Sequence, residues 1–130
     1  MSDVPADLKY TKDHEWVRVS GNRAVVGITH HAERQMGDVV YVELPKVGDQ
    51  FEAEGALGSV ESVKAVSEVF SPLTGKVVKV NEELTDSPEL LNEDPYGEGW
   101  IVELEFSDSK QLSSLLDAAS YTKLIQDSAG

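Results

Sequence analysis

Apolar and polar residues alternate along much of the first 106 positions, which is typical of short β-strands with one buried face. The cleanest alternation covers residues 100–106, where we predict a strand with an apolar face and a mostly charged face. The residues of the predicted apolar face are Trp100, Val102, Leu104 and Phe106. Those of the opposite face are Ile101, Glu103 and Glu105.

Further strands are expected wherever short apolar runs lie between turn residues. Their ranges are 16–19, 23–28, 39–44, 55–61, 66–70 and 76–80. Within the third range the residues expected to share one face are Val40, Val42 and Leu44, and those of the other are Tyr41 and Glu43. A tight turn near residues 63–65 is expected to join the fourth and fifth strands into a hairpin.

The spacing of apolar residues becomes helical in two places. Thr29 and Gly37 have the right chemistry to begin and end one short internal helix. A C-terminal helical region is expected at about 108–126, where apolar residues lie three or four positions apart. They are Leu112, Leu115, Leu116, Ala119, Tyr121, Leu124 and Ile125. We therefore predict a mainly β fold, a small sandwich or barrel in one domain (1–130), with its core at about 8–106 and helices outside.

Composition restricts the partners of such a domain. The 130 residues include 11 Lys and Arg against 24 Asp and Glu, a formal net charge of −13. This charge would repel phosphate backbones and anionic membranes, so neither nucleic acid nor a membrane is expected as a partner. It favours solubility and attraction to proteins with positive rims around their active sites. Because the chain has no cysteine, any sulfur redox chemistry would have to come from a cofactor.

Motifs for common enzymatic chemistry are missing from the sequence. It has no phosphate-binding glycine loop, no nucleophile elbow and no metalloprotease histidine pair. The spacing of His14, His30 and His31 makes them poor joint metal ligands, so surface or capping roles are expected and no metal site is predicted. The N-terminal segment resembles no targeting signal, so a bacterial cytoplasm is expected, or a mitochondrial matrix only if a transit peptide was removed.

Lys64 stands out by its position in the predicted hairpin turn, between Val63 and Ala65. A lysine at such a turn is ordinarily a solvated surface residue. A turn between two rigid strands is also a suitable place for a modified lysine, because it combines exposure with a fixed position. Both interpretations are open on the spacing alone.

Several ordered blocks of the sequence resemble those of glycine cleavage H proteins. Glu61-Ser62-Val63-Lys64-Ala65 resembles the lipoylation motif of that family. The other matching blocks are His14-Glu15-Trp16-Val17, Gly27-Ile28-Thr29, 37–45 and 92–100. Gly75 lies where lipoyl and biotinyl domains also place a turn glycine. The resemblance covers about residues 8–124, which is nearly the whole chain.

This resemblance implies a lipoyl/biotinyl-like β-sandwich (a barrel-sandwich hybrid) and a carrier rather than an enzyme. One lipoate would be attached covalently to Lys64 by a lipoate ligase, or by an octanoyltransferase and lipoyl synthase. The lipoyl arm would take the aminomethyl group of glycine from the PLP-dependent decarboxylase (P protein) to the aminomethyltransferase (T protein). Dihydrolipoyl dehydrogenase (L protein) would then reoxidise the arm. The family expectation is a monomer.

In that family the loaded arm folds into a cleft on the carrier. By motif position, Asp13, Glu15 and Glu68 would approach its cationic amine, which a carboxylate can hold by a charge-assisted hydrogen bond. The sequence departs from the family pattern at two of these positions, since the family often has serine at Asp13 and aspartate at Glu68. Glu61, in the lipoylation motif, is expected to help the lipoylating enzymes recognise the hairpin.

Four alternative functions remain open. Two are other carriers: a lipoyl domain of a 2-oxoacid dehydrogenase system, and a biotin carrier, whose lysine is typically flanked by methionines rather than by Val63 and Ala65. A lipoyl-relay protein would use the same chemistry at Lys64. A small acidic hydrolase or interaction module is a distant alternative, because no nucleophile and base converge in the sequence.

Overall fold

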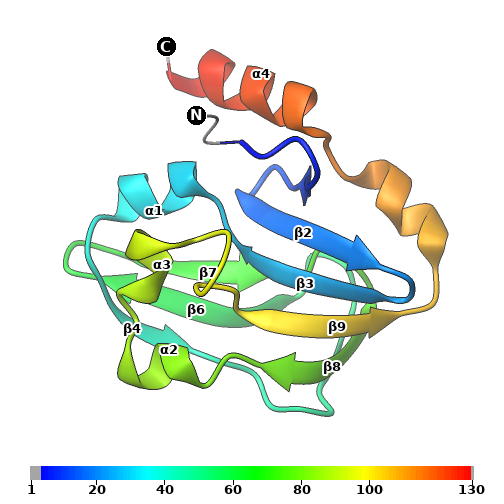
Figure 1. Cartoon of the computed structure of the whole chain (residues 1–130), viewed down its shortest axis with the longest axis horizontal. Coiled ribbons are helices and arrows are strands. Elements are labelled where there is room, and N and C mark those ends of the chain that lie inside the picture. Colours follow the sequence, from blue (N-terminus) through cyan, green and yellow to red (C-terminus); the bar gives the residue numbers. More distant parts are fainter. Residues whose placement is uncertain (1–3, 130) are drawn as a thin grey trace.

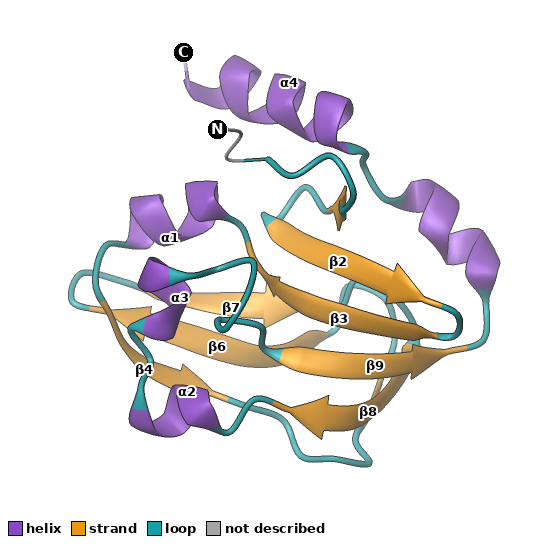
Figure 2. Ribbon diagram, viewed as in Figure 1, coloured by secondary structure: helices purple, strands orange, loops and turns teal. Residues whose placement is uncertain are grey.

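The computed structural model describes the backbone of residues 4–129 and the side chains of residues 4–127. Two sheets pack against each other, with short helices at one end and a longer C-terminal helix outside the larger sheet (Figures 1 and 2). The strands are β1 (Lys9–Tyr10), β2 (Glu15–Ser20), β3 (Arg23–Ile28), β4 (Val39–Glu43), β5 (Gln50–Phe51), β6 (Ala56–Ser62), β7 (Val66–Phe70), β8 (Gly75–Val80) and β9 (Val102–Phe106). The helices are α1 (His30–Met36), α2 (Glu83–Asp86), α3 (Leu90–Glu93), the 3-10 helix η1 (Ser109–Ser114) and α4 (Ala118–Ala129).

All strand pairs of both sheets are antiparallel. The larger sheet has the order β1-β2-β3-β9-β8-β5, and the smaller sheet has the order β4-β6-β7. The turn between β6 and β7 lies at the same end of the molecule as α1 (Figure 1). The expected mainly β sandwich, with a short internal helix and C-terminal helices, is confirmed.

Among the described residues, buried apolar side chains form three clusters. The largest lies between the sheets, where Leu104 of the larger sheet packs in one cluster with Val42 and Val60 of the smaller sheet. A second cluster lies beneath α4 and contains Trp16 and Tyr121. Burying one large apolar side chain contributes roughly 1.5–3 kcal/mol, so these clusters hold the two sheets and α4 together.

The last strand begins later than its alternating pattern predicts. Val102, Leu104 and Phe106 are buried as expected, but β9 starts at Val102 and not at Trp100. Ile101, which was expected on the charged face, is only 1% exposed and belongs to the main core. Its backbone N–H donates to the carbonyl of Val26, outside the β3–β9 ladder, so the strict alternation does not extend to this residue.

The predicted faces of the 39–44 strand are confirmed for Val42 and Leu44, which pack in the core, but wrong for Val40. A β-bulge lies between Val39 and Tyr41 where β4 pairs with β6. Val39 and Val42 are consequently buried, whereas Val40 is 49% exposed. A bulge adds one residue to a strand and so reverses the faces of the side chains on one side of it.

The predicted internal helix is confirmed, and its ends have the expected caps. The Thr29 hydroxyl accepts a hydrogen bond from the Ala32 amide at 3.2 Å, and the Gly37 amide donates to the Glu33 carbonyl at 3.0 Å. The C-terminal region is helical, but its first part is a 3-10 helix, and Leu116 then pairs in extended form with Tyr10. Among residues 4–129 no helix has the length and apolar character needed to cross a membrane.

Candidate functional site

The β6–β7 hairpin presents Lys64 at its tip, where the side chain is exposed. The last pair of the ladder joins Glu61 to Val66. The Ser62 amide then donates to the Ala65 carbonyl at 2.8 Å and closes the turn. The tight turn expected near residues 63–65 is therefore confirmed.

The Ser62 side chain stabilises this turn. It is only 6% exposed, and its hydroxyl oxygen accepts hydrogen bonds from the amides of Lys64 (3.3 Å) and Ala65 (3.1 Å). On the other side the Val63 amide donates to the Asp38 carbonyl at 3.1 Å. Hydrogen bonds on both sides thus hold the backbone at Lys64, which gives its exposed side chain a fixed starting point.

The Lys64 side chain lies beside the end of α1. A Cβ atom added at Gly37 would stand 3.5 Å from Lys64 Cε. Within the described part of the chain, the Lys64 amine forms no ion pair. The Lys64 amine can therefore react without first breaking an ion pair.

A cleft of about 330 Å³ opens next to the hairpin. One wall is the loop of Asp13 and His14 leading into β2, a second is α1 through Ala32 and Met36, and the third is the hairpin from Ala65. Apolar side chains line much of it, and carboxylates of three residues border it. We name this space the arm cleft.

Glu15 is the buried carboxylate of the arm cleft. It is 2% exposed, accepts a hydrogen bond from the Thr11 hydroxyl at 2.7 Å, and accepts another from the Phe70 amide at 3.0 Å. Burial raises the pKa of Glu15 to about 7, although these two hydrogen bonds act in the opposite direction. Glu15 also borders a second cavity of about 380 Å³, which Asp13 lines as well.

The other two predicted carboxylates, Asp13 and Glu68, also border the arm cleft, and both are exposed. The structure therefore brings all three acids to one cleft, from segments that are more than fifty positions apart in the sequence. Their side chains differ in environment: only Glu15 is removed from water.

The expectation of surface or capping roles is wrong for His14. Its ring is half-buried, borders the arm cleft, and places Nδ1 2.8 Å from the Tyr121 hydroxyl. Burial lowers the pKa of His14, and the neighbouring ring of His31 lowers it further. No pattern along the sequence links His14 to Tyr121, because 107 positions separate them.

The residues around Lys64 fit a lipoyl group in amide linkage to its side chain. The amine is exposed on a fixed turn, and the adjacent cleft offers apolar walls together with carboxylates. No group of three or more His, Asp or Glu residues suited to a metal ion is present among the described residues.

The fold and site define a carrier domain, in which a β-sandwich presents one lysine at a hairpin turn beside a cleft. The model of the glycine cleavage H-protein family matches residues 8–128. The chain belongs to this family.

Similar proteins agree with this assignment over almost the full length. A glycine cleavage system H protein of Myxococcus xanthus is 60% identical over 126 residues, covering 97% of this chain and 98% of that protein. One of Herpetosiphon aurantiacus is 58% identical over 129 residues, covering 99% and 98%. The crystal structure of a glycine cleavage system H protein from Mycobacterium marinum superposes with a TM-score of 0.81 at 33% identity, covering 97% of this chain and 99% of that one.

Proposed function

We propose that this chain is the lipoyl-bearing shuttle of the glycine cleavage system, with the lipoyl group in amide linkage to Lys64. The observation that carries the proposal is the exposed Lys64 on a turn fixed by Ser62, next to the arm cleft. When bound, the lipoyl group supplies two sulfur atoms that accept the aminomethyl group of glycine and alternate between disulfide and dithiol. The protein itself is a carrier and not a catalyst.

The chain's own residues hold and protect the cargo. Apolar side chains line the arm cleft, and Asp13, Glu15 and Glu68 border it, so a cationic amine placed there would gain charge-assisted hydrogen bonds. The buried Glu15 is the best placed of the three, because a charge interaction is strongest where water is excluded.

The proposed partners are the P, T and L proteins, together with a lipoate ligase or an octanoyltransferase and lipoyl synthase. Each must admit Lys64 and its arm into an active site, and the net charge of −13 favours active-site rims that are positive. The similar proteins described above are bacterial, so the proposed compartment is the bacterial cytoplasm. Glu61, exposed beside the turn, is proposed to contact the lipoylating enzymes.

Intact-mass measurement of the protein from lipoate-replete cells tests this function. We expect one lipoyl group on the wild-type chain, none on Lys64→Arg, and one on the control Lys76→Arg, whose lysine is exposed on β8 of the other sheet. Glu61→Ala should be modified several-fold more slowly in the same assay. An unmodified Lys64 in cells whose other lipoyl proteins are modified would contradict the proposal.

A further inference from the structure

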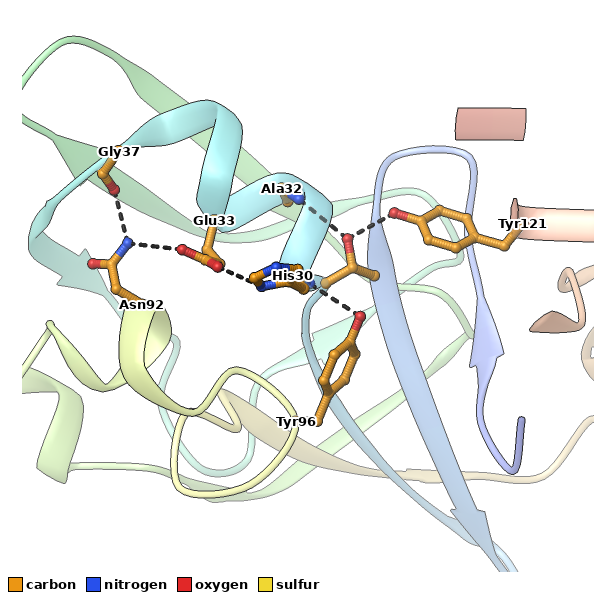
Figure 3. A network of polar contacts seen from close by, with 8 residues as sticks. His30, Ala32, Glu33, Gly37, Asn92, Tyr96 and Tyr121 are labelled. Atoms are coloured by element: carbon orange, nitrogen blue, oxygen red, sulfur yellow. Dashed lines mark hydrogen bonds and ion pairs between the residues drawn. The ribbon is translucent and has the colours of Figure 1, made fainter. Parts of the chain in front are cut away.

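One buried hydroxyl group joins two walls of the arm cleft. Tyr121 is 0% exposed, and its oxygen lies 2.8 Å from His14 Nδ1 and 2.7 Å from Thr29 Oγ1. Figure 3 shows the Tyr121 ring reaching from α4 to the beginning of α1. Among the residues that line the arm cleft, none belongs to α4.

Both partners of Tyr121 control the position of a cleft wall. Thr29 caps α1, which forms one wall, by accepting a hydrogen bond from Ala32 at 3.2 Å. His14 belongs to the opposite loop and has a left-handed backbone, with φ 69°. The Thr29 amide donates to the His14 carbonyl at 3.0 Å, so a backbone bond also joins the two walls here.

The hydrogen-bond donors and acceptors of the Thr29–Tyr121–His14 contact can be assigned without conflict. Burial and the ring of His31 lower the pKa of His14 and so favour its neutral form, and burial raises the pKa of Tyr121 to about 12, so its hydroxyl keeps its proton. Thr29 can then donate to Tyr121, and Tyr121 can donate to Nδ1 of His14. Without the tyrosine hydroxyl, two polar groups in a largely buried place would lose their shared partner.

We propose that Tyr121 is a positioning residue that holds the His14 loop and α1 at their spacing, so that the C-terminal helix keeps the walls of the arm cleft in place around the loaded arm without lining the cleft. This proposal rests on the carrier function proposed above. It assigns to α4 a role in cargo retention and none in the modification of Lys64, whose turn is held by Ser62 and Asp38.

Tyr121→Phe tests this role with a close control in the same cluster. Tyr10 is also 0% exposed and stacks on Tyr121 with 4.7 Å between the ring centroids, but its hydroxyl donates to the Pro5 carbonyl. Tyr10→Phe therefore removes a buried tyrosine hydroxyl from the same cluster without breaking a contact to either cleft wall.

The first measurement is amide hydrogen exchange on the unmodified chain. Tyr121→Phe should speed exchange of the Thr29 and Ala32 amides by about 5- to 20-fold relative to Tyr10→Phe, as expected when a buried hydrogen bond is lost. At the Thr29 amide, which donates to the His14 carbonyl, Thr29→Val should act like Tyr121→Phe, and Thr29→Ser, which keeps the hydroxyl, should keep wild-type protection. Equal exchange in the two tyrosine variants would overturn the role of Tyr121 in wall spacing.

The second measurement is the lifetime of the aminomethyl-loaded, lipoylated carrier. We expect Tyr121→Phe to shorten it by about 3- to 10-fold, while the rate of Lys64 lipoylation stays at the wild-type value. Faster exchange with an unchanged lifetime would overturn the role in cargo retention. Failure of the carrier function itself would appear differently, as a wild-type chain that accepts no lipoyl group, and the exchange measurement does not depend on that result.

Discussion

At the scale of single residues, the acid chemistry of the cleft depends on burial. Asp13, Glu15 and Glu68 are three carboxylates in one cleft, yet only Glu15 is enclosed, with hydrogen bonds to a hydroxyl and a backbone amide. Burial raises the pKa of Glu15 to about 7, so at neutral pH the folded protein holds it protonated far more than an exposed carboxyl group would be, and an ammonium group brought beside it would favour the carboxylate. The charge of Glu15 is thus coupled to what occupies the cleft.

The raised pKa of Glu15 predicts a pH-dependent stability. Its pKa rises from 4.5 to about 7, so the folded chain binds more protons than the unfolded chain between these values. The contribution of Glu15 to the free energy of unfolding should be highest below pH 4.5 and should fall as the pH rises through 7. The amide of Glu15→Gln resembles the protonated carboxyl group. The free energy of unfolding of this variant should therefore decrease by about 1–3 kcal/mol less than that of wild type over the same pH range.

Urea unfolding of wild type and Glu15→Gln at pH 5 and pH 8 measures this difference. A stability gap between the two proteins that is the same at both pH values would rule out the raised pKa.

The same variant should shorten the lifetime of the aminomethyl-loaded carrier, because a neutral amide cannot form an ion pair with a cation. An unchanged lifetime would show that Glu15 does not hold the cargo.

At the scale of elements, the end of α1 and the β6–β7 turn form one unit around Lys64. Gly37 ends the helix with φ 79° and ψ −154°, a conformation that essentially only glycine adopts without strain. Its carbonyl accepts a hydrogen bond from Asn92 at 2.8 Å, and the Asn92 side chain also accepts from the Val39 amide at 2.9 Å. These contacts fix the start of β4 against α3, and Asp38 in this segment holds the hairpin turn.

Gly37→Ala should disturb this unit in two ways. The backbone strain should cost about 1–3 kcal/mol of stability, and the new methyl group would stand 3.5 Å from Lys64 Cε. Gly48→Ala is the matched control, because Gly48 has φ 100° and no heavy atom within 4 Å of an added Cβ. Lipoylation by a lipoate ligase should slow several-fold for Gly37→Ala only, because the strained residue lies beside Lys64, and equal rates in both variants would contradict a role of the end of α1 in positioning the lysine.

At the scale of the whole molecule, the net charge of −13 acts on every encounter with a partner. Exposed carboxylates also lie on the smaller sheet, where Glu61 of β6 comes just before the Lys64 turn and Glu43 of β4 pairs with Ser59 farther along the same strand. Surface charges of this kind change the association rate more than the lifetime of a complex.

The association rate with the decarboxylase should fall by about 10-fold between 0.05 and 0.5 M salt, since salt screens long-range attraction. A Glu43→Gln, Glu61→Gln variant should associate more slowly than a Glu82→Gln, Glu83→Gln variant with the same net charge, whose exposed acids lie at the start of α2. Stopped-flow measurements decide this, and equal rates for the two variants would contradict local steering by the acids of the smaller sheet.

The sequence by itself determined the mainly β class, the hairpin that carries Lys64 and the capped helix α1. These features depend on local patterns: alternation, turn chemistry and cap residues act over a few positions. The family blocks also indicated the three carboxylates, although their common cleft became visible only in the folded chain. The two-residue strands β1 and β5 were too short to leave a periodic pattern.

Tertiary structure decided the rest, because burial and pairing depend on residues that are distant along the chain. The bulge at Val39 and Tyr41 arises from the pairing of β4 with β6, so no local pattern reveals it. Ile101 is buried because it packs in the core between the sheets, although its position in the alternation predicts exposure. The contact of Tyr121 with His14 and Thr29 forms only when α4 packs over β1 and β2. This contact connects the last helix of the chain to the cleft beside Lys64.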